Sequence, residues 1–200
     1  MSDSAVACII FIAVMIIIIS ERIHRAVVAI FGAVLLLALG VMDVEAAAVY
    51  VDFNTIGVLV GMMLFMAIVK YSGLFESLAV ISAKAAKGDP WRIMIIYMII
   101  TALLSSVIDN VTTVLLMGPV TLAITRALRV NPVPFLMTQI MASNIGGTAT
   151  LIGDPPNIMI GGAAGLSFMD FVIFNGPVVL IVMTVIIIFF KFLYRSEMKN

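Results

Sequence analysis

A polar run rich in glycine and proline interrupts an otherwise apolar chain between residues 143 and 157, where the sequence reads SNIGGTATLIGDPPN. Gly146 and Gly147 weaken a helix at this point. Pro155 and Pro156 each lack the backbone N–H that a continuing helix requires. Pro155 also favours an extended conformation for the residue before it. These residues therefore exclude a continuous helix through the run.

Composition places this interruption inside a membrane protein. Hydrophobic residues make up 64% of the 200 residues and charged residues only 11%, and the mean hydropathy is +1.26. A soluble domain of this length cannot bury so much apolar surface, so we expect an all-α integral protein in contact with the lipid bilayer. Irregular backbone persists at membrane depth only where protein or water surrounds it. The run thus predicts a polar site inside the bilayer.

The same composition narrows the classes of function. The net charge is zero, which argues against nucleic acid as a partner. The single cysteine, Cys8, and the single histidine, His24, provide neither an internal disulfide nor a cluster of soft-metal ligands. The sequence contains no nucleophile–base arrangement and no phosphate-binding loop. We therefore expect neither an enzyme nor a bound cofactor.

Apolar segments divide the chain into about five membrane crossings. They cover approximately residues 4–20, 26–42, 55–69, 135–163 and 176–194. The crossing over 135–163 contains the interruption and is expected to be a discontinuous helix. An amphipathic helix over 74–87 is expected at the membrane interface. Residues 167–175 are expected to form a separate short segment around Asp170.

Residues 91–129 form a long apolar run without a hydrophilic loop, and the basic residues indicate how it is oriented. Cytoplasmic loops carry an excess of Lys and Arg. All 11 basic residues fall on one side only if both ends of this run lie at the same face. We therefore expect a re-entrant helical hairpin with its tip at Asp109-Asn110; two full spans joined there are the alternative. The basic loops and the C-terminus are then cytoplasmic.

The hairpin tip carries a first group of candidate ion-binding residues. They are Ser105, Asp109, Asn110, Thr112 and Thr113. A carboxylate inside a membrane marks a functional site by default, so Asp109 is a candidate ligand for a proton or a coupling ion. In the alternative interpretation its carboxylate caps the next helix near Thr112, and both roles are compatible. Ser105 lies one turn earlier on the same face.

The interrupted helix carries a second group of candidate residues. They are Ser143, Asn144, Gly146, Gly147, Thr148, Thr150, Gly153, Asp154 and Asn157. The glycines would let backbone carbonyl groups approach a ligand closely. Carbonyl, hydroxyl and amide oxygens suit a hard cation such as Na⁺, so Na⁺ or H⁺ is the expected coupling ion. Asp154 is interpreted either as an ion ligand or as an Asx-type turn that locks the break at Pro155 and Pro156.

The run over residues 143–157 resembles the signature of the ArsB/NhaD branch of the ion transporter superfamily, in which a Gly-Gly-Thr…Gly-Asp-Pro-Pro-Asn segment interrupts a membrane helix. Arsenite efflux pumps, sodium/proton antiporters and citrate and dicarboxylate carriers belong to this superfamily. The resemblance implies a secondary transporter with its site between the hairpin tip and the broken helix. Relatives carry a Ser-Asn-Thr motif at the tip. This chain instead has Asp109-Asn110-Val111-Thr112, which adds a titratable charge.

The resemblance also implies a protein of about twice this length, built from two inverted halves. Because the number of crossings is odd, a second unit of this kind joined in series would lie in the membrane in the inverted orientation. The sequence contains no second copy of the 143–157 signature, so it does not include that second unit. We interpret the sequence as the first half of a secondary transporter in a prokaryotic plasma membrane. Its substrate would be arsenite or antimonite, Na⁺ exchanged for H⁺, or a di- or tricarboxylate. The expected partner is a second half-transporter chain or a homo-oligomer, and a half that does not transport alone is the alternative.

Overall fold

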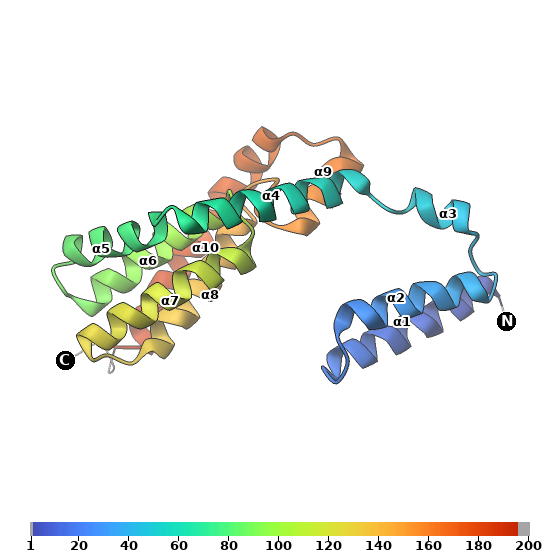
Figure 1. The fold of residues 1–200 in the computed structure, drawn as a ribbon. Helices are drawn as coiled ribbons and strands as arrows, with labels where there is room; N and C mark the ends of the chain where they lie inside the picture. Colours follow the sequence, from blue (N-terminus) through green and yellow to red (C-terminus); the bar gives the residue numbers. More distant parts are fainter. Residues whose placement is uncertain (1, 196–200) are drawn as a thin grey trace. The chain divides into compact units, whose positions relative to one another are not determined.

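The structure, a computed structural model, describes residues 2–195, and these residues fold into helices without any β-strand. Contacts within the chain divide it into two units, one up to Phe53 and one from Asn54 onward. The helices of both units are labelled in Figure 1. All of the predicted site residues belong to the second unit.

The first unit contains three helices. They are α1 (Asp3–Ile19), α2 (Arg25–Ala38) and α3 (Val44–Val49). The helices α1 and α2 pack along one another. Gly32 permits this contact, because a Cβ atom on it would lie 2.5 Å from the Cγ2 atom of Val14. The Nδ1 atom of His24 accepts the N–H of Ala26 at 3.3 Å and so caps the start of α2.

The second unit contains seven helices. They are α4 (Phe53–Tyr71), α5 (Leu74–Ala85), α6 (Pro90–Ser105), α7 (Asn110–Leu128), α8 (Pro132–Gly147), α9 (Pro155–Ala164) and α10 (Phe168–Leu193). The expected amphipathic segment over 74–87 is helical as α5, whereas its position at a membrane interface stays a prediction. The chain over residues 148–154 is not helical, so α8 and α9 are separate helices.

The prediction of two separate segments, 167–175 and 176–194, is wrong. The structure has one helix of 26 residues, α10, over both. Ser167 and Asp170 form a capping box that starts this helix ahead of the polar residues. Pro177 lies inside α10 without ending it, because a membrane helix tolerates the loss of one backbone hydrogen bond.

Three of the described helices, α4, α7 and α10, are long and apolar enough to cross a membrane. Large apolar side chains such as Phe65, Leu115 and Leu180 are exposed on them. An exposed apolar surface of this extent matches lipid rather than water. The chain is thus an integral membrane protein, whereas the number of crossings, the re-entrant topology and the side on which each loop lies stay predictions.

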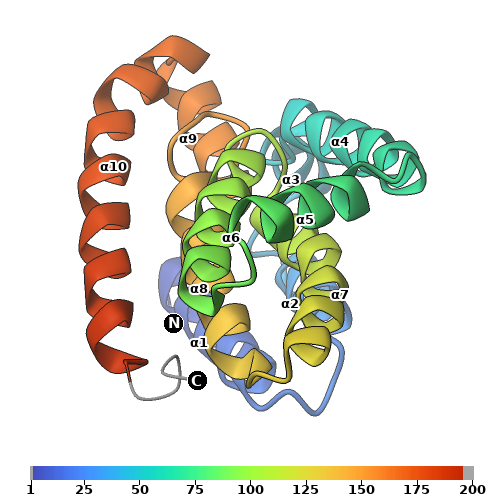
Figure 2. The same cartoon turned by 90° about the vertical axis from the view of Figure 1, so that its left-hand side faces the viewer.

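The helices α6, α7 and α8 form the centre of the second unit (Figure 2). The helices α6 and α8 pack most extensively, and α7 contacts both. Two short turns join the three helices in sequence, so α6 and α8 run parallel and α7 runs antiparallel to them. Met98, Met117 and Phe135 are buried in the core between them. This arrangement brings the C-terminal ends of α6 and α8 to the same end of the unit.

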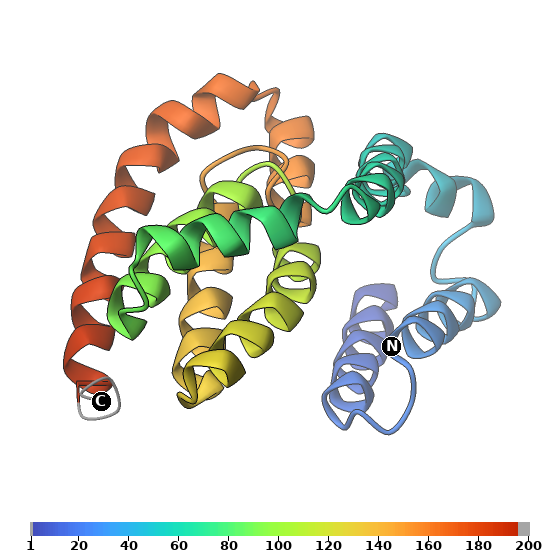
Figure 3. The same cartoon turned by 60° about the vertical axis from the view of Figure 1, so that its left-hand side comes forward.

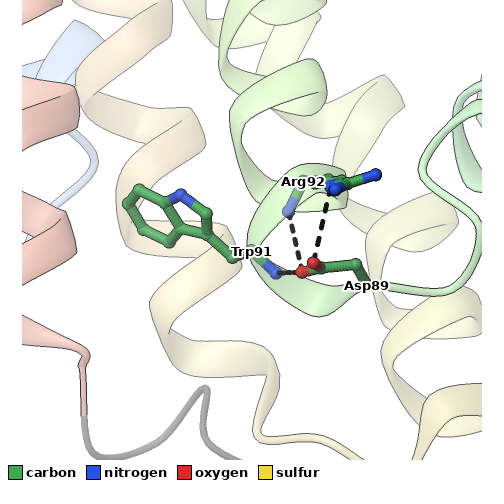
Figure 4. A network of polar contacts seen from close by, with 3 residues as sticks. All are labelled: Asp89, Trp91 and Arg92. Carbon is green, nitrogen blue, oxygen red and sulfur yellow. Dashed lines mark hydrogen bonds and ion pairs between the residues drawn. The ribbon is translucent and has the colours of Figure 1, made fainter.

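The start of α6 is fixed by Asp89 (Figure 4). Its Oδ1 atom accepts the backbone N–H groups of Trp91 at 2.9 Å and Arg92 at 3.2 Å. Its Oδ2 atom lies 3.6 Å from the Nε atom of Arg92 in an exposed ion pair. Pro90 occupies the first helical turn, where the N–H that it lacks would have no helical partner.

Candidate functional site

Four helix ends meet at the candidate site. The loop between α6 and α7 (residues 106–109) and the break between α8 and α9 (residues 148–154) lie together at one end of the second unit (Figure 3). The C-terminal ends of α6 and α8 present carbonyl groups, which favour cations, and the N-terminal ends of α7 and α9 present N–H groups, which favour anions. The structure thus brings the hairpin tip next to the break, as expected for a site between them, whereas binding of an ion there stays a prediction.

Two serines join the tip to the broken helix. The hydroxyl of Ser105, at the end of α6, donates to the carbonyl oxygen of Ser143 on α8 at 2.8 Å. The hydroxyl of Ser143 donates to the carbonyl oxygen of Asn110 at 2.7 Å and lies 3.3 Å from the hydroxyl oxygen of Ser105. Both serines are fully buried. They hold α6, α7 and α8 together immediately below the tip.

Two asparagines form the more open side of the site. The Nδ2 atom of Asn110 donates to the Oδ1 atom of Asn144 at 2.9 Å, and the Nδ2 atom of Asn144 donates to the carbonyl oxygen of Ile140 at 2.9 Å. Both asparagines line a hollow of about 230 Å³ together with apolar side chains of α7 and α8. Asn144 is exposed on this side of the second unit.

Asn157 and Thr150 hold the break in shape. The Nδ2 atom of Asn157, on α9, donates to the carbonyl oxygens of Gly147 at 3.2 Å and Thr150 at 2.9 Å. The hydroxyl of Thr150 donates to the carbonyl oxygen of Ser106 and accepts the N–H of Gly153 at 3.2 Å. Asn157 thus connects the end of α8 to the start of α9, and Thr150 connects the break to the hairpin.

The glycines of the break allow close approach of backbone atoms. A Cβ atom on Gly146 would overlap the backbone of Ala102 on α6. A Cβ atom on Gly153 would overlap the carbonyl oxygen of Gly147 and lie 2.7 Å from that of Ser105. Both glycines are buried. Their role in the structure is packing, and any contact with a ligand stays a prediction.

The acids of the site differ in their local roles. The Oδ1 atom of Asp109 accepts the N–H of Thr112 at 2.8 Å, and its carbonyl oxygen accepts the hydroxyl of Thr113 at 3.0 Å. Asp109 is therefore the cap of α7. Asp154 has an extended backbone, and its carboxylate makes no capping hydrogen bond to the described first turn of α9, so the Asx-type turn is not formed. Asp109 follows the end of α6 and Asp154 precedes α9, so both acids lie where the hairpin tip meets the break.

The remaining predicted residues lie at the edge of the break. The hydroxyl of Thr148 donates to the carbonyl oxygen of Ile145 at 2.8 Å, and the carbonyl oxygen of Thr148 accepts the Nδ2 atom of Asn175 on α10 at 3.0 Å. Pro155 and Pro156 form the first turn of α9, where their missing N–H groups have no helical partner. A new helix thus begins at Pro155 after the break, and hydrogen bonds from side chains stabilise the break.

The residues of the site fit a hard cation better than a soft metal. Among the described residues, no group of three or more His, Cys, Asp or Glu side chains gathers as a metal centre. The polar groups at the tip and the break are carboxylate, hydroxyl, amide and carbonyl groups, which match Na⁺ or a proton.

Several buried polar side chains near the site were not predicted from the sequence. Thr101, Gln139 and Thr121 are fully buried in the helices below the tip, and Asn175 connects α10 to the break. Thr101 precedes Ser105 by four residues and Gln139 precedes Ser143 by four, so each pair shares a helix face. This spacing is the signal in the sequence that could have identified Thr101 and Gln139.

Comparison with known proteins gives the family. The sequence pattern that defines a citrate transporter family matches residues 15–200. The chain belongs to this family. The citrate transporter family is part of the ArsB/NhaD-type ion transporter superfamily, so the resemblance found in the 143–157 signature is confirmed. The family is one of membrane transporters.

Similar proteins occur in bacteria and in mammals. An uncharacterized transporter of Mycobacterium bovis is 42% identical over 197 residues, which cover 96% of this chain and 46% of that protein. The 46 kDa membrane protein of Mycobacterium leprae is 40% identical over 197 residues, again covering 96% and 46%. The human P protein is 39% identical over 148 residues, covering 72% of this chain and 18% of that protein. The chain thus spans about half the length of the mycobacterial relatives that it matches.

Proposed function

We propose that this chain forms one half of a secondary active transporter that moves an inorganic ion in exchange for, or together with, H⁺ or Na⁺. The observation that carries this proposal is the junction of the hairpin tip with the helix break, where the hydroxyl of Thr150 donates to the carbonyl oxygen of Ser106. Each of the two segments contributes one acid, Asp109 and Asp154. A carboxylate inside a membrane protein is costly unless a cation or a proton neutralises it, so both acids are candidate ligands of the coupling ion. The place where the two segments meet would then be the binding site of the coupling ion.

The surrounding groups support a cation. The C-terminal ends of α6 and α8 point their carbonyl groups at the site. Hydroxyl and amide groups of Ser143, Asn110 and Asn144 lie next to it. These oxygens favour Na⁺ or H⁺ as the coupling ion, and the substrate would be arsenite or antimonite, or Na⁺ exchanged for H⁺.

A di- or tricarboxylate is the second candidate substrate, and two observations favour it. The matching family is described as a citrate transporter, and the N-terminal ends of α7 and α9 at the site favour anions. Two ionised acids would repel a carboxylate, so this substrate requires that a cation or a proton neutralise Asp109 and Asp154 first. The order of binding would then couple the substrate to the ion.

The length of the relatives supports a second half. Because the chain covers 46% of the M. bovis relative, the complete transporter would bring a second set of helices against this site. That second half would come from the remainder of a longer chain, from a second half-transporter chain, or from a homo-oligomer. Inverted halves that enclose one site are the usual architecture of such carriers.

Flux in proteoliposomes tests the proposal. The purified chain, alone and together with a second half-transporter chain, is reconstituted under an imposed proton or sodium gradient. Saturable, gradient-dependent movement of arsenite or Na⁺ supports the first candidate, and gradient-dependent citrate uptake supports the second. Single-channel currents without saturation would show a channel instead, and absence of flux in every combination would overturn the proposal.

A further inference from the structure

Two polar atoms lie fully buried below the candidate site without a hydrogen-bond partner among the described residues. They are the Oγ1 atom of Thr101 on α6 and the Oε1 atom of Gln139 on α8, and both residues are 0% exposed. Each lies one helical turn before a residue of the bonded pair Ser105 and Ser143. Because α6 and α8 run parallel and Ser105 bonds to Ser143, stepping back one turn on each helix puts the backbones of Thr101 and Gln139 at a similar height.

The hydrogen-bond network fixes which end of the Gln139 amide is unpaired. The Nε2 atom of Gln139 donates to the Oγ1 atom of Thr121 at 2.7 Å. The hydroxyl proton of Thr121 is already donated to the carbonyl oxygen of Met117 at 2.9 Å. The hydroxyl of Thr121 can therefore only accept from Gln139, which places the amide nitrogen towards α7. The unpaired atom of Gln139 is then an acceptor oxygen.

A ligand for this pair of atoms must supply at least one hydrogen-bond donor. A buried acceptor without a donor is strongly unfavourable, and folded proteins usually satisfy such groups with an internal water molecule. A dehydrated cation fits less well, because it needs a nearly complete shell of oxygen ligands. Nearby hydroxyl protons are already donated to backbone carbonyl groups, as that of Thr138 is to Phe135 at 2.9 Å.

We propose that Thr101 and Gln139 bind an internal water molecule one turn below the candidate ion site. The water would donate to the Oε1 atom of Gln139 and bond to the hydroxyl of Thr101. Buried threonines continue along one face of α7 at Thr113, Thr121 and Thr125. The water site and these threonines would thus continue the row of buried polar groups from the hairpin tip towards the opposite end of α6, α7 and α8.

The water site would form part of a route for the coupling ion through the protein. This role of the water rests on the proposed function. A proton or small cation that leaves Asp109 and Asp154 needs polar groups in its path, because bare hydrocarbon excludes it. The water site continues that path by one helical turn. Water binding itself depends only on the fold and is tested without any transport assay.

Hydroxyl-radical footprinting of the purified chain in lipid nanodiscs tests the water site. Radiolysis activates bound water, which then oxidises neighbouring methionines. Met98 lies one turn before Thr101 on α6, and Met117 lies one turn before Thr121 on α7; both side chains are 0% exposed. Met66 on α4 is a comparison residue, because its side chain is also buried, at 2% exposed, and it belongs to a different helix.

We expect Met98 and Met117 to be oxidised faster than Met66 in the unmodified chain. The double variant Thr101→Val and Gln139→Leu approximately keeps the side-chain volumes but removes both polar atoms, and it should slow oxidation of Met98 and Met117 to the rate of Met66. The matched control is Thr138→Val, because the Thr138 hydroxyl is equally buried but bonded within its own helix. This control should leave the oxidation rates unchanged.

Two results would overturn the water site. One is slow oxidation of Met98 and Met117 in the unmodified chain, at the rate of Met66, and this comparison needs no variant. The other is oxidation that the double variant leaves unchanged. Flux is measured separately, in proteoliposomes that contain the same variants together with a second half-transporter chain. If oxidation slows but flux persists, the water site stands and its role in the ion route is wrong. If no combination with a second half-transporter chain shows flux, the proposed function fails without affecting the footprinting result.

Discussion

Gly146 of α8 lies against the backbone of Ala102 of α6, so that even a methyl group on Gly146 would overlap the Ala102 carbonyl group. The two helices therefore approach each other at backbone distance where they reach the hairpin tip. This approach brings the hydroxyl of Ser105 within 2.8 Å of the carbonyl oxygen of Ser143. A residue that looks like a helix breaker in the sequence thus acts as a packing contact that assembles the site.

Replacing Gly146 with alanine should separate α6 from α8. The added methyl group meets backbone rather than a flexible side chain, so we expect a loss of stability of about 1–3 kcal/mol and a loss of flux. Thermal melting in detergent and flux in proteoliposomes measure the two effects. The control is Gly118→Ala in α7, where nothing lies within 4 Å of the added Cβ atom. If Gly146→Ala melts as the control does, the close packing is wrong.

Replacing Asn157 with aspartate should disrupt the break more than replacing it with alanine. Aspartate puts an acceptor where Asn157 now donates to the carbonyl oxygens of Gly147 and Thr150. Repulsion then adds to the loss of two hydrogen bonds, so we expect about 1–3 kcal/mol of destabilisation and no flux, with membrane insertion intact. Melting temperatures, flux and the membrane fraction of the expressed protein are compared. Equal effects of the two variants would contradict the role of the amide as a donor.

Replacing Asp109 with asparagine separates the cap of α7 from the charge. Asparagine can still accept the N–H of Thr112, and it caps helices about as well as aspartate, so stability should hardly change. The lost carboxylate should abolish coupled flux or remove its dependence on pH. Asp109→Ala, which loses the cap as well, should also melt earlier. If Asp109→Asn transports with unchanged pH dependence, the carboxylate acts only as a cap.

Replacing Asp89 with alanine should destabilise α6 by about 1 kcal/mol, because two N–H groups lose their acceptor. Arg92→Gln is the control that removes only the ion pair. That pair joins side chains that are 62% and 47% exposed, so its loss should matter little. Melting curves of the two variants measure the difference. A larger effect from Arg92→Gln would mean that the ion pair and not the cap fixes the start of α6.

Several local features of the fold were predictable from the sequence. Pro155 and Pro156 prevent a helix from continuing, and the structure indeed restarts it at Pro155. Asp109 precedes a helix at the distance at which a carboxylate caps N–H groups, and it does cap Thr112. The division of residues 167–194 into two segments failed, because the capping box of Ser167 and Asp170 extends α10 across polar residues that look like a loop.

The sequence by itself determined where helices break, which segments are apolar enough to lie in lipid, and which family the 143–157 signature resembles, because these depend on neighbouring residues. Only the tertiary structure decided which polar groups meet. Ser105 and Ser143 are 38 residues apart, and their contact depends on parallel packing of α6 with α8 at backbone distance. The same packing buries Thr101 and Gln139 one turn below these serines. Helical spacing in the sequence places each of them on the face of its serine, but it does not show that the two helices pack together.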